Sequence, residues 1–396
     1  MPPKKVETVA IHAGSRLGSS SAQGVAPPLY LASVSYFADA ETLDASLDGK
    51  DFVYTRISAQ NVVLLEEAVA ALEDAEACAA YASGMSALRA VLEAQSLRPG
   101  DCVVMPADGY GATRALFKAL LAPREVELHP LLLSEHDAPR KIIALRPKFV
   151  LAESITNPLL SVADLPKLIQ ACREVGARFA VDATFASPVL QQAHRLGADY
   201  AVHSTTKWIN GHSDAMGGVV SGSAENIAPL RSARVLEGGI LGPFEAWLTL
   251  RGIRTLPLRM KAHSQNALDV ANRLRASEDL ERVIYPGLPS HPDHAVAHTV
   301  LKGGFGGMLA FEIKGATRRE SFRFLECLQL AKPAPSLGDV TTLAMHPATA
   351  SARRMTAQER EAAGIRENLI RVSVGLEHPD DIAEDLLQAV RRVRER

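Results

Sequence analysis

Apolar residues recur in two different patterns along the first half of the chain. Over 64–73 the leucines and the valine recur at helical spacing with acids on the opposite face, which predicts a helix. A second helix is expected to open at 83–85 and to run through Leu92. Beyond it, short apolar runs alternate with helical segments, with strands expected at 102–105, 148–152, 178–182 and 199–202 and helices at 113–121, 165–175 and 189–196. This alternation is typical of an α/β fold with a mostly parallel sheet covered on both faces.

The pattern changes after about residue 245. Two long helices are expected at 244–251 and 258–275, then separate strands at 282–285, 308–313 and 369–374, and a terminal helix at 380–394. A chain of 396 residues exceeds what one hydrophobic core usually supports. The first fifty-odd residues are rich in Ser, Gly, Ala and Pro and need another surface to pack on. We therefore expect an N-terminal arm at 1–55, a large domain at 56–244 and a smaller α+β domain at 245–396.

Composition and charge bear on the binding partners and the compartment that we expect. The formal net charge of −2 offers no electrostatic attraction to nucleic acid or to an anionic membrane. No stretch approaches the roughly 20 apolar residues of a membrane span, and the first five residues are not followed by the apolar core of a secretion signal. The four cysteines have no C-x-x-C spacing. We therefore expect a cytoplasmic protein with no disulfide framework and no metal site.

The chemistry concentrates in the stretch 203–214. Lys207 follows the strand expected at 199–202, and Asp182 ends an earlier strand. In open α/β sheets ligands bind at this edge, where burial can lower the pKa of a lysine amine and make it nucleophilic. A lysine paired with a carboxylate suits pyridoxal 5'-phosphate (PLP). Lys207 would hold the aldehyde as a Schiff base and Asp182 would keep the pyridine nitrogen protonated.

Six blocks lie in order along the chain, at 81–85, 110–113, 153–158, 203–214, 285–292 and 371–377. Together these blocks resemble the Cys/Met-metabolism (transsulfuration) family of PLP enzymes. The family includes cystathionine γ-lyase, cystathionine γ-synthase, methionine γ-lyase and O-acylhomoserine sulfhydrylase. The resemblance implies an aspartate aminotransferase-like fold type I structure, with a mostly parallel sheet and a smaller α+β C-terminal domain.

The resemblance also implies roles for individual residues. The amides of Gly84 and Met85 and the hydroxyls of Ser204 and Thr206 would hold the cofactor phosphate. Tyr110 would stack on the pyridine ring and help acid-base steps beside the catalytic Lys207. The cofactor-binding set expected on this basis is Gly84, Met85, Tyr110, Asn157, Asp182, Ser204, Thr206, Lys207, Tyr54 and Arg56.

Two further groups complete the expected site. Arg371 lies inside an apolar strand, and a buried arginine needs an anion that suits its planar fork. By resemblance that anion is the α-carboxylate of an amino-acid substrate, with Ser336 and Asn157 nearby. Tyr54 and Arg56 would reach the phosphate of a neighbouring subunit. We therefore expect a homo-oligomer, a dimer of dimers, whose active sites are shared between two chains.

The sequence departs from the family pattern in places that bear on the substrate. The Asn-Pro-Thr turn usual after Arg56 is replaced within 57–61, Ala183 stands where asparagine is usual, and Ile155 replaces a usual proline. Pro335 stands where many members that handle cystathionine carry an acid. We expect γ-elimination on a sulfur-containing or γ-substituted amino acid such as cystathionine, methionine or homocysteine, with cystathionine used weakly and small or apolar γ-substituents preferred. A γ-replacement reaction is the alternative.

Rival interpretations lack supporting residues. The run Ser204–Lys207 also matches the S-x-x-K motif of penicillin-binding enzymes, but the chain has no K-T-G partner. A cofactor-binding protein without catalysis would have no need to keep Lys207, Asp182, Tyr110 and Arg371 together. Turnover of any amino acid would show that the chain is an enzyme and not a cofactor-binding protein without catalysis.

Overall fold

The computed structural model describes residues 4–15, 24–47 and 51–395. Its larger sheet has seven strands in the order β1-β7-β6-β5-β4-β2-β3. The strands are β1 Ala77–Tyr81, β2 Cys102–Pro106, β3 Glu127–Leu131, β4 Phe149–Glu153, β5 Arg178–Asp182, β6 Tyr200–His203 and β7 Gly218–Gly222. Strands β3, β2, β4, β5 and β6 run parallel, and β7 is antiparallel to both of its neighbours. The expectation of a mostly parallel sheet is confirmed.

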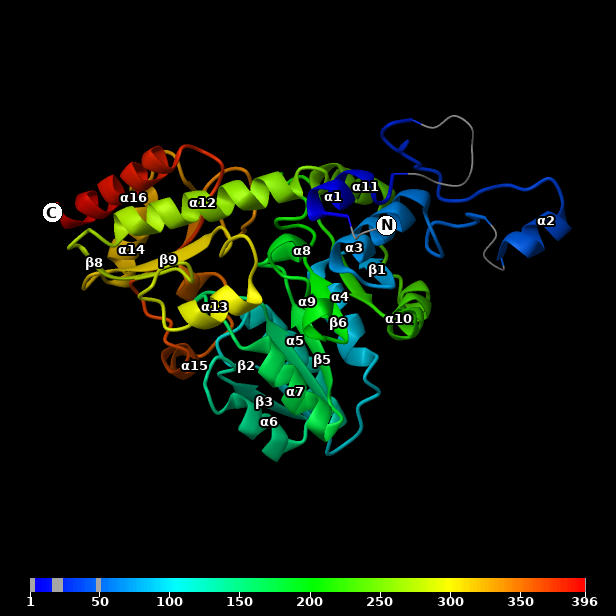
Figure 1. Cartoon of the computed structure of the whole chain (residues 1–396), viewed down its shortest axis with the longest axis horizontal. Coiled ribbons are helices and arrows are strands. Elements are labelled where there is room, and N and C mark those ends of the chain that lie inside the picture. Colours follow the sequence, from blue (N-terminus) through cyan, green and yellow to red (C-terminus); the bar gives the residue numbers. More distant parts are fainter. Residues whose placement is uncertain (1–3, 16–23, 48–50, 396) are drawn as a thin grey trace.

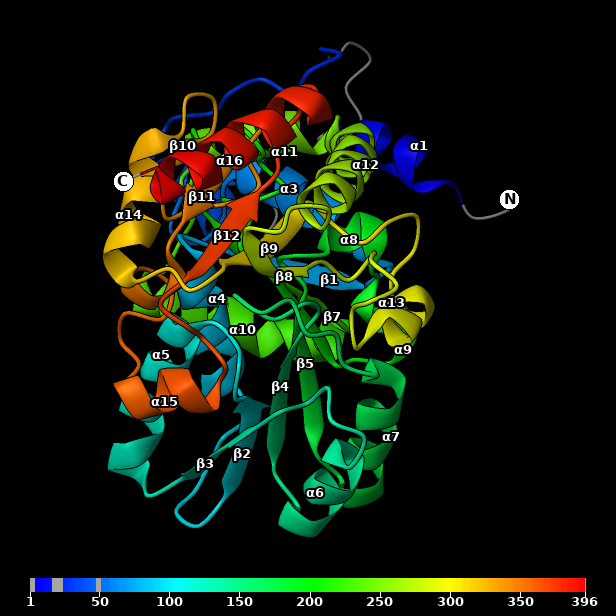
Figure 2. The same cartoon turned by 90° about the vertical axis from the view of Figure 1, so that its left-hand side faces the viewer.

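Helices cover both faces of this sheet, as Figures 1 and 2 show. On one face lie α6 (Ala138–Leu145), α7 (Leu165–Val175) and α9 (Ala193–Leu196), which share a core with the sheet. On the other lie α4 (Gly84–Glu93), α5 (Gly111–Leu121) and α10 (Ala224–Glu237). Because successive strands are parallel, the ends of β4, β5 and β6 meet at one edge, which faces the second sheet.

One predicted helix is wrong in detail. The helix expected over 189–196 is broken into α8 (Ser187–Leu190) and α9, because Gln191 and Gln192 between them have extended backbones. The side chain of Gln192 donates to the Leu72 carbonyl at 2.6 Å, and that of Gln191 donates to the Val300 carbonyl at 3.3 Å. Bonds to distant segments replace the helical bonds at this point, and periodicity alone does not reveal them.

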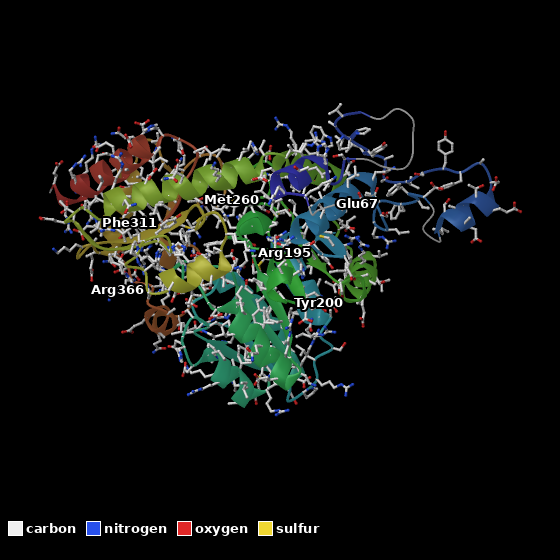
Figure 3. All side chains as sticks on the ribbon, viewed as in Figure 1. Glu67, Arg195, Tyr200, Met260, Phe311 and Arg366 are labelled. Carbon is white, nitrogen blue, oxygen red and sulfur yellow. The ribbon has the colours of Figure 1, made fainter. Side chains whose placement is uncertain are left out.

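The second sheet has five strands in the order β10-β11-β12-β9-β8. The strands are β8 Leu280–Ile284, β9 Met308–Ile313, β10 Lys332–Pro333, β11 Leu343–Met345 and β12 Leu369–Ser373. Helices α12 (Leu256–Leu274), α14 (Arg318–Cys327) and α16 (Pro379–Arg394) pack on it around a separate apolar cluster. Figure 3 locates two buried side chains in different clusters, Met260 on α12 and Phe311 in β9.

Helix α12 links the two parts of the molecule. It runs along the upper edge of Figure 1 from α1 (Val6–His12) and α11 towards α16. Helix α11 (Pro243–Ile253) packs against α3 (Gln60–Glu73) beside the large sheet. The remaining helices are α2 Ala40–Ala45, α13 His294–Val300 and α15 Ala357–Ala362. The division at residues 244 and 245 stays a prediction.

The N-terminal arm, meaning here the described residues 24–47 and 51–55, extends away from both sheets. In Figure 1 its helix α2 lies far to the right of the rest of the chain. Apolar side chains on it face solvent: Tyr36 is 98% exposed and Val25 91%. An antiparallel bridge between Val34 and Tyr54 ties its two stretches together, with further hydrogen bonds between 32–35 and 52–55. The arm therefore buries little of its own apolar surface.

Candidate functional site

A cavity of about 600 Å³ lies where the two sheets face each other. Its inner wall comes from the ends of β4, β5 and β6 and from the start of α4, and its outer wall comes from the segments 335–337 and 345–353. Most of the residues expected from the sequence line it: Gly84, Met85, Tyr110, Asn157, Asp182, Ser204, Thr206, Lys207 and Arg371. Segments far apart in the sequence thus meet at one place.

Lys207 lies in the loop directly after β6, as expected. Its backbone N–H donates to the Ser204 carbonyl at 3.2 Å, and its own carbonyl accepts from Gly211 N–H at 2.8 Å. Gly338 packs against this loop so closely that a Cβ there would lie 2.5 Å from the Trp208 nitrogen. Lys207 Nζ donates to Ser336 Oγ at 2.9 Å. Burial, helped by the nearby Arg371 cation, lowers the pKa of the amine to about 8.

The start of α4 forms a corner suited to an anion. Ser83 caps the helix by accepting from Ser86 N–H at 3.2 Å, which leaves the N–H groups of Gly84 and Met85 at the open helix end. Gly84 approaches Ser204 so closely that a Cβ on it would lie 2.9 Å from the Ser204 Cβ. The helix start can lie this close to Ser204 only because residue 84 has no side chain.

Thr206 closes the same corner. Its Oγ1 accepts from Gly217 N–H at 3.0 Å and donates to the Gly217 carbonyl at 3.2 Å. Ser204 is placed by its own N–H, which donates to Thr184 Oγ1 at 2.9 Å. These bonds fix the positions of two hydroxyl-bearing residues beside the helix start.

Two carboxyl groups stand at the ends of neighbouring strands. Asp182 and Glu153 are paired in the β4–β5 register, and both line the cavity. Asp182 accepts from Thr184 N–H at 3.0 Å, yet burial raises its pKa. Burial, with Asp182 nearby, raises the pKa of Glu153 well above its usual range. A cationic N–H beside Asp182 would favour its ionised form, so a protonated pyridine nitrogen fits this position.

The sequence did not single out Glu153 as a site residue. Glu153 accepts from the backbone N–H of Tyr110 at 2.7 Å and from that of Asn157 at 3.2 Å. It thereby holds two residues that line the cavity. The available signal in the sequence was an acid that follows an apolar run, the same pattern that singled out Asp182.

Arg371 lies in β12 and is almost fully buried, as its apolar neighbours predicted. Its Nη1 donates to Asn157 Oδ1 at 3.0 Å and its Nη2 donates to the Ser336 carbonyl at 2.8 Å. The Nε–H has no partner among the described residues. Burial lowers the pKa of the guanidinium to about 10. No anion neutralises it within the described part of the chain, so it can take a substrate carboxylate.

Tyr110 is 36% exposed and lines the cavity as the residue before α5. Tyr54 and Arg56 do not reach this cavity. Arg56 Nη1 donates to the Val235 carbonyl at 2.8 Å, and its guanidinium lies 5.3 Å from the centre of the Tyr54 ring. Within one chain, the structure brings together every other predicted residue and leaves these two outside.

The set fits PLP in its chemistry. A half-buried amine, a carboxyl for the ring nitrogen, a helix start with hydroxyls and an unneutralised arginine all border one cavity. Among residues 4–15, 24–47 and 51–395 there is no group of three or more His, Cys, Asp or Glu that could hold a metal ion. No helix in those ranges is long and apolar enough to cross a membrane.

The chain matches known proteins along nearly its whole length. The family model described as Cys/Met metabolism PLP-dependent enzyme matches residues 7–391. An O-succinylhomoserine sulfhydrylase of Pseudomonas aeruginosa is 37% identical, over 97% of this chain and 94% of that protein. An L-methionine gamma-lyase of Fusobacterium nucleatum subsp. polymorphum is also 37% identical, over 98% of each.

A solved structure is similar in fold. The crystal structure of cystathionine gamma synthase from Xanthomonas oryzae pv. oryzae, in complex with aminoacrylate and cysteine, has a TM-score of 0.92. It is 38% identical and covers 99% of each chain. Similarity therefore extends to proteins with three different reactions.

Proposed function

Since the chain belongs to the Cys/Met metabolism PLP-dependent enzymes, we propose that it catalyses γ-elimination on an amino acid with a sulfur or oxygen substituent at Cγ. The observation that carries the proposal is the half-buried Lys207 amine, with its lowered pKa, in the same cavity as the unneutralised Arg371. One group can move protons at the substrate while the other holds its carboxylate.

The chain's residues divide the work as follows. When bound, PLP supplies an electron sink for the carbanion that forms at the substrate Cα. Lys207 would carry the cofactor and, once freed by the substrate amine, would take the α-proton and later move protons to and from Cβ. A lysine with a pKa of about 8 can serve as a base near neutral pH, whereas an ordinary lysine stays almost fully protonated there. Tyr110, at the cavity wall, assists the proton transfers.

Binding and orientation come from residues around Lys207. Arg371 holds the substrate α-carboxylate, with Asn157 and Ser336 fixed beside it by the hydrogen bonds that they already make to its guanidinium. The open amides of Gly84 and Met85 would bind the cofactor phosphate, together with the hydroxyls of Ser204 and Thr206. The same hydroxyl of Ser336 that accepts from Lys207 can release the amine when the substrate arrives. Asp182 would hold the ring nitrogen of the cofactor in its protonated form.

The γ-substituent then faces the outer wall of the cavity. Whether the intermediate is hydrolysed to a 2-oxo acid and ammonia or captured by a second thiol depends on access at that wall. The alternative is therefore a γ-replacement enzyme, which the similarity to a sulfhydrylase and a synthase favours.

One panel assay tests the proposal. Cystathionine, methionine, homocysteine and O-acylhomoserines are supplied with and without an added thiol, and 2-oxo acid and thioether products are measured. We expect 2-oxo acid without thiol. A product that forms only with thiol would make the chain a γ-replacement enzyme, and no turnover of any panel member would refute both forms of the proposal.

We also propose a cytoplasmic homo-oligomer, a dimer of dimers. The location rests on four free cysteines, three of them buried. The assembly rests on the exposed arm and on Tyr54 and Arg56, which lie outside their own chain's cavity. In the proposed pair of chains, these two residues reach the phosphate in the partner's site. The arm at 1–55, the large domain at 56–244 and the C-terminal domain at 245–396 are part of the same proposal.

A further inference from the structure

The outer wall of the cavity carries one cation that has no role so far. Arg353 lines the cavity and is exposed. No ion pair or side-chain hydrogen bond of its guanidinium to another described residue is found, unlike Arg360 on the same segment, which donates to the Met355 carbonyl at 2.8 Å. A guanidinium at a cavity wall without an acid partner is available to a ligand.

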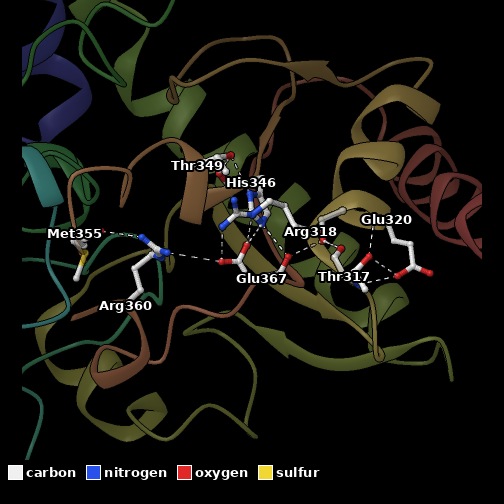
Figure 4. A network of polar contacts seen from close by, with 9 residues as sticks. Thr317, Arg318, Glu320, His346, Thr349, Met355, Arg360 and Glu367 are labelled. Atoms are coloured by element: carbon white, nitrogen blue, oxygen red, sulfur yellow. Dashed lines mark hydrogen bonds and ion pairs between the residues drawn. The ribbon is translucent and has the colours of Figure 1, made fainter. Parts of the chain in front are cut away.

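The segment that carries Arg353 is held firmly from both sides. His346 contacts Thr349 Oγ1 at 2.9 Å and the Glu367 carbonyl at 2.9 Å, and the Arg360 guanidinium lies 3.9 Å from the Glu367 carboxylate. Figure 4 shows this network around residues 346–360, together with the Met355 carbonyl. The backbone beside Arg353 is therefore set by contacts that do not involve Arg353.

The opposite side of the segment rests on α5. A Cβ on Gly111, next to Tyr110, would lie 2.6 Å from the Ser351 carbonyl, so the two backbones are in close contact. The Ser351 hydroxyl also finds no hydrogen-bond partner among the described residues. The segment thus brings an unpartnered hydroxyl and an unpartnered guanidinium to the same wall, beside the Tyr110 loop.

Charges are distributed unevenly around the cavity. Its acids lie at the strand ends of the inner wall, where Glu153 is buried and Asp182 is half-buried. The outer wall consists of Pro335, Leu337, Met345, Thr349, Ala350, Ser351 and Arg353, and none of these is acidic. A substrate that places its α-carboxylate on Arg371 would point its γ-substituent at a wall with one positive charge and no negative one.

We propose that Arg353 is a specificity residue that binds a carboxylate at the far end of the γ-substituent. This inference rests on the proposed function for the placement of the α-carboxylate. Pro335 leaves a distal ammonium without a partner, and Arg353 adds a partner for a distal anion. The preferred leaving group is then an acyloxy or alkylthio group that ends in a carboxylate, rather than the small or apolar group expected from the sequence.

A binding test separates this inference from the reaction itself. L-2-Aminosuberate and L-2-aminooctanoate have equal chain lengths and no γ-leaving group, and only the first ends in a second carboxylate. Their dissociation constants for the cofactor-loaded protein are measured from the change in cofactor absorbance. We expect the dicarboxylate to bind about five- to tenfold more tightly, at the modest end for a charge-assisted pair because solvent screens the exposed guanidinium.

Three variants test whether Arg353 causes the preference for the dicarboxylate. In Arg353→Ala the ratio of the two dissociation constants should fall to about one, while binding of L-2-aminooctanoate is unchanged. Arg353→Lys should keep part of the preference for the dicarboxylate because the charge remains. Arg354→Ala is the matched control, because Arg354 is the adjacent exposed cation and does not line the cavity. Equal binding of both compounds by the wild type, or an unchanged preference in Arg353→Ala, would overturn the inference.

Turnover adds a second readout. The ratio of kcat/KM for O-succinyl-L-homoserine to that for O-acetyl-L-homoserine should fall by the same factor in Arg353→Ala and stay constant in Arg354→Ala. If neither these esters nor the sulfur substrates of the panel react, the proposed function fails while the binding preference still tests Arg353. If both react with a ratio that does not depend on residue 353, the function stands and the specificity role is wrong.

Discussion

At the scale of single residues, the site depends on groups whose charge is disfavoured by burial. Lys207 and Arg371 both have lowered pKa values because the cavity wall removes water from them. The two cations also repel each other, which lowers the pKa of Lys207 further. A buried charge without an anion destabilises a protein unless a ligand supplies one. The substrate carboxylate is the group that completes this arrangement.

The pKa of Lys207 leads to a pH prediction. In protein stripped of cofactor, the rate of PLP capture should rise with pH and level off above a midpoint near 8, because only the neutral amine attacks the aldehyde. A lysine with an unperturbed pKa of about 10.4 would still be gaining reactivity at pH 9. Stopped-flow absorbance at a series of pH values measures the midpoint. Lys207→Ala is the control and should show no fast phase, whereas a wild-type rate that keeps rising beyond pH 9 would contradict the lowered pKa.

At the scale of elements, apolar periodicity predicted the helix Leu165–Val175 and the strand Arg178–Asp182 with the bounds that the structure has. Strand β7 was missed because its sequence, Gly218–Gly222, contains two glycines and reads as a loop. Strand β3 was missed because it is only partly buried and contains a proline. Each of these two strands pairs with strands that lie elsewhere in the sequence, and a local sequence pattern does not show such pairing.

The same limit applies to the site. Asp182 and Arg371 could be predicted because each is a charged residue at the end of, or inside, an apolar strand, and Lys207 could be predicted because it lies in the loop that follows one. Arg353 could not, because it lies in a charged loop without periodicity, and only the packing of that loop against α5 brings it to the cavity. A site residue that an apolar strand positions can be predicted from the sequence pattern, whereas a residue that loop packing positions cannot.

Helix α12 carries a buried group whose titration affects stability. His263 Nδ1 lies 2.8 Å from the Val374 carbonyl, and its ring meets Trp208 edge-on at 4.6 Å. Burial lowers its pKa to about 4, with Arg259 also lowering it and the hydrogen bond to Val374 and the Asp339 charge opposing the shift. Since the unfolded histidine titrates near 6.5, the unfolded state binds more protons between about pH 6.5 and 4. Stability is therefore lost as pH falls through that window.

A substitution tests this titration. We expect the free energy of unfolding to fall from pH 6.5 to 4.5 less steeply in His263→Phe than in the wild type, by up to about 1.4 kcal/mol per pH unit. Urea unfolding at several pH values measures the slope. His136→Phe, at an exposed position, is the matched control and should keep the wild-type slope. Identical slopes in all three proteins would show that His263 does not contribute.

At the scale of the whole molecule, the arm is the part that a single chain does not explain. Tyr36, Leu31 and Val25 expose most of their apolar surface, and Tyr54 is 42% exposed. An extended apolar segment of this kind marks a protein interaction surface. A second copy of the chain satisfies both needs, since it would cover the arm and receive Tyr54 and Arg56 at its own cavity.

Mixing two inactive variants tests shared sites. Arg56→Ala and Lys207→Ala should each lack most activity alone, because in an oligomer of either variant every site lacks one required residue. After unfolding and joint refolding, random pairing makes half of the pairs hybrid, and one of the two sites in each hybrid has both native residues. About a quarter of wild-type activity should return. Absence of recovery in oligomers shown by mass to be mixed would argue that each site is built from one chain.

The central claim is that Lys207 holds PLP in the cavity between the two sheets. Borohydride reduction of the cofactor-loaded protein, followed by proteolysis and mass spectrometry, identifies the lysine that carries it. The account predicts a reduced pyridoxyl group on the peptide that contains Lys207 and on no other. A label on a different lysine, or a protein that binds PLP with Lys207 unmodified, would contradict it.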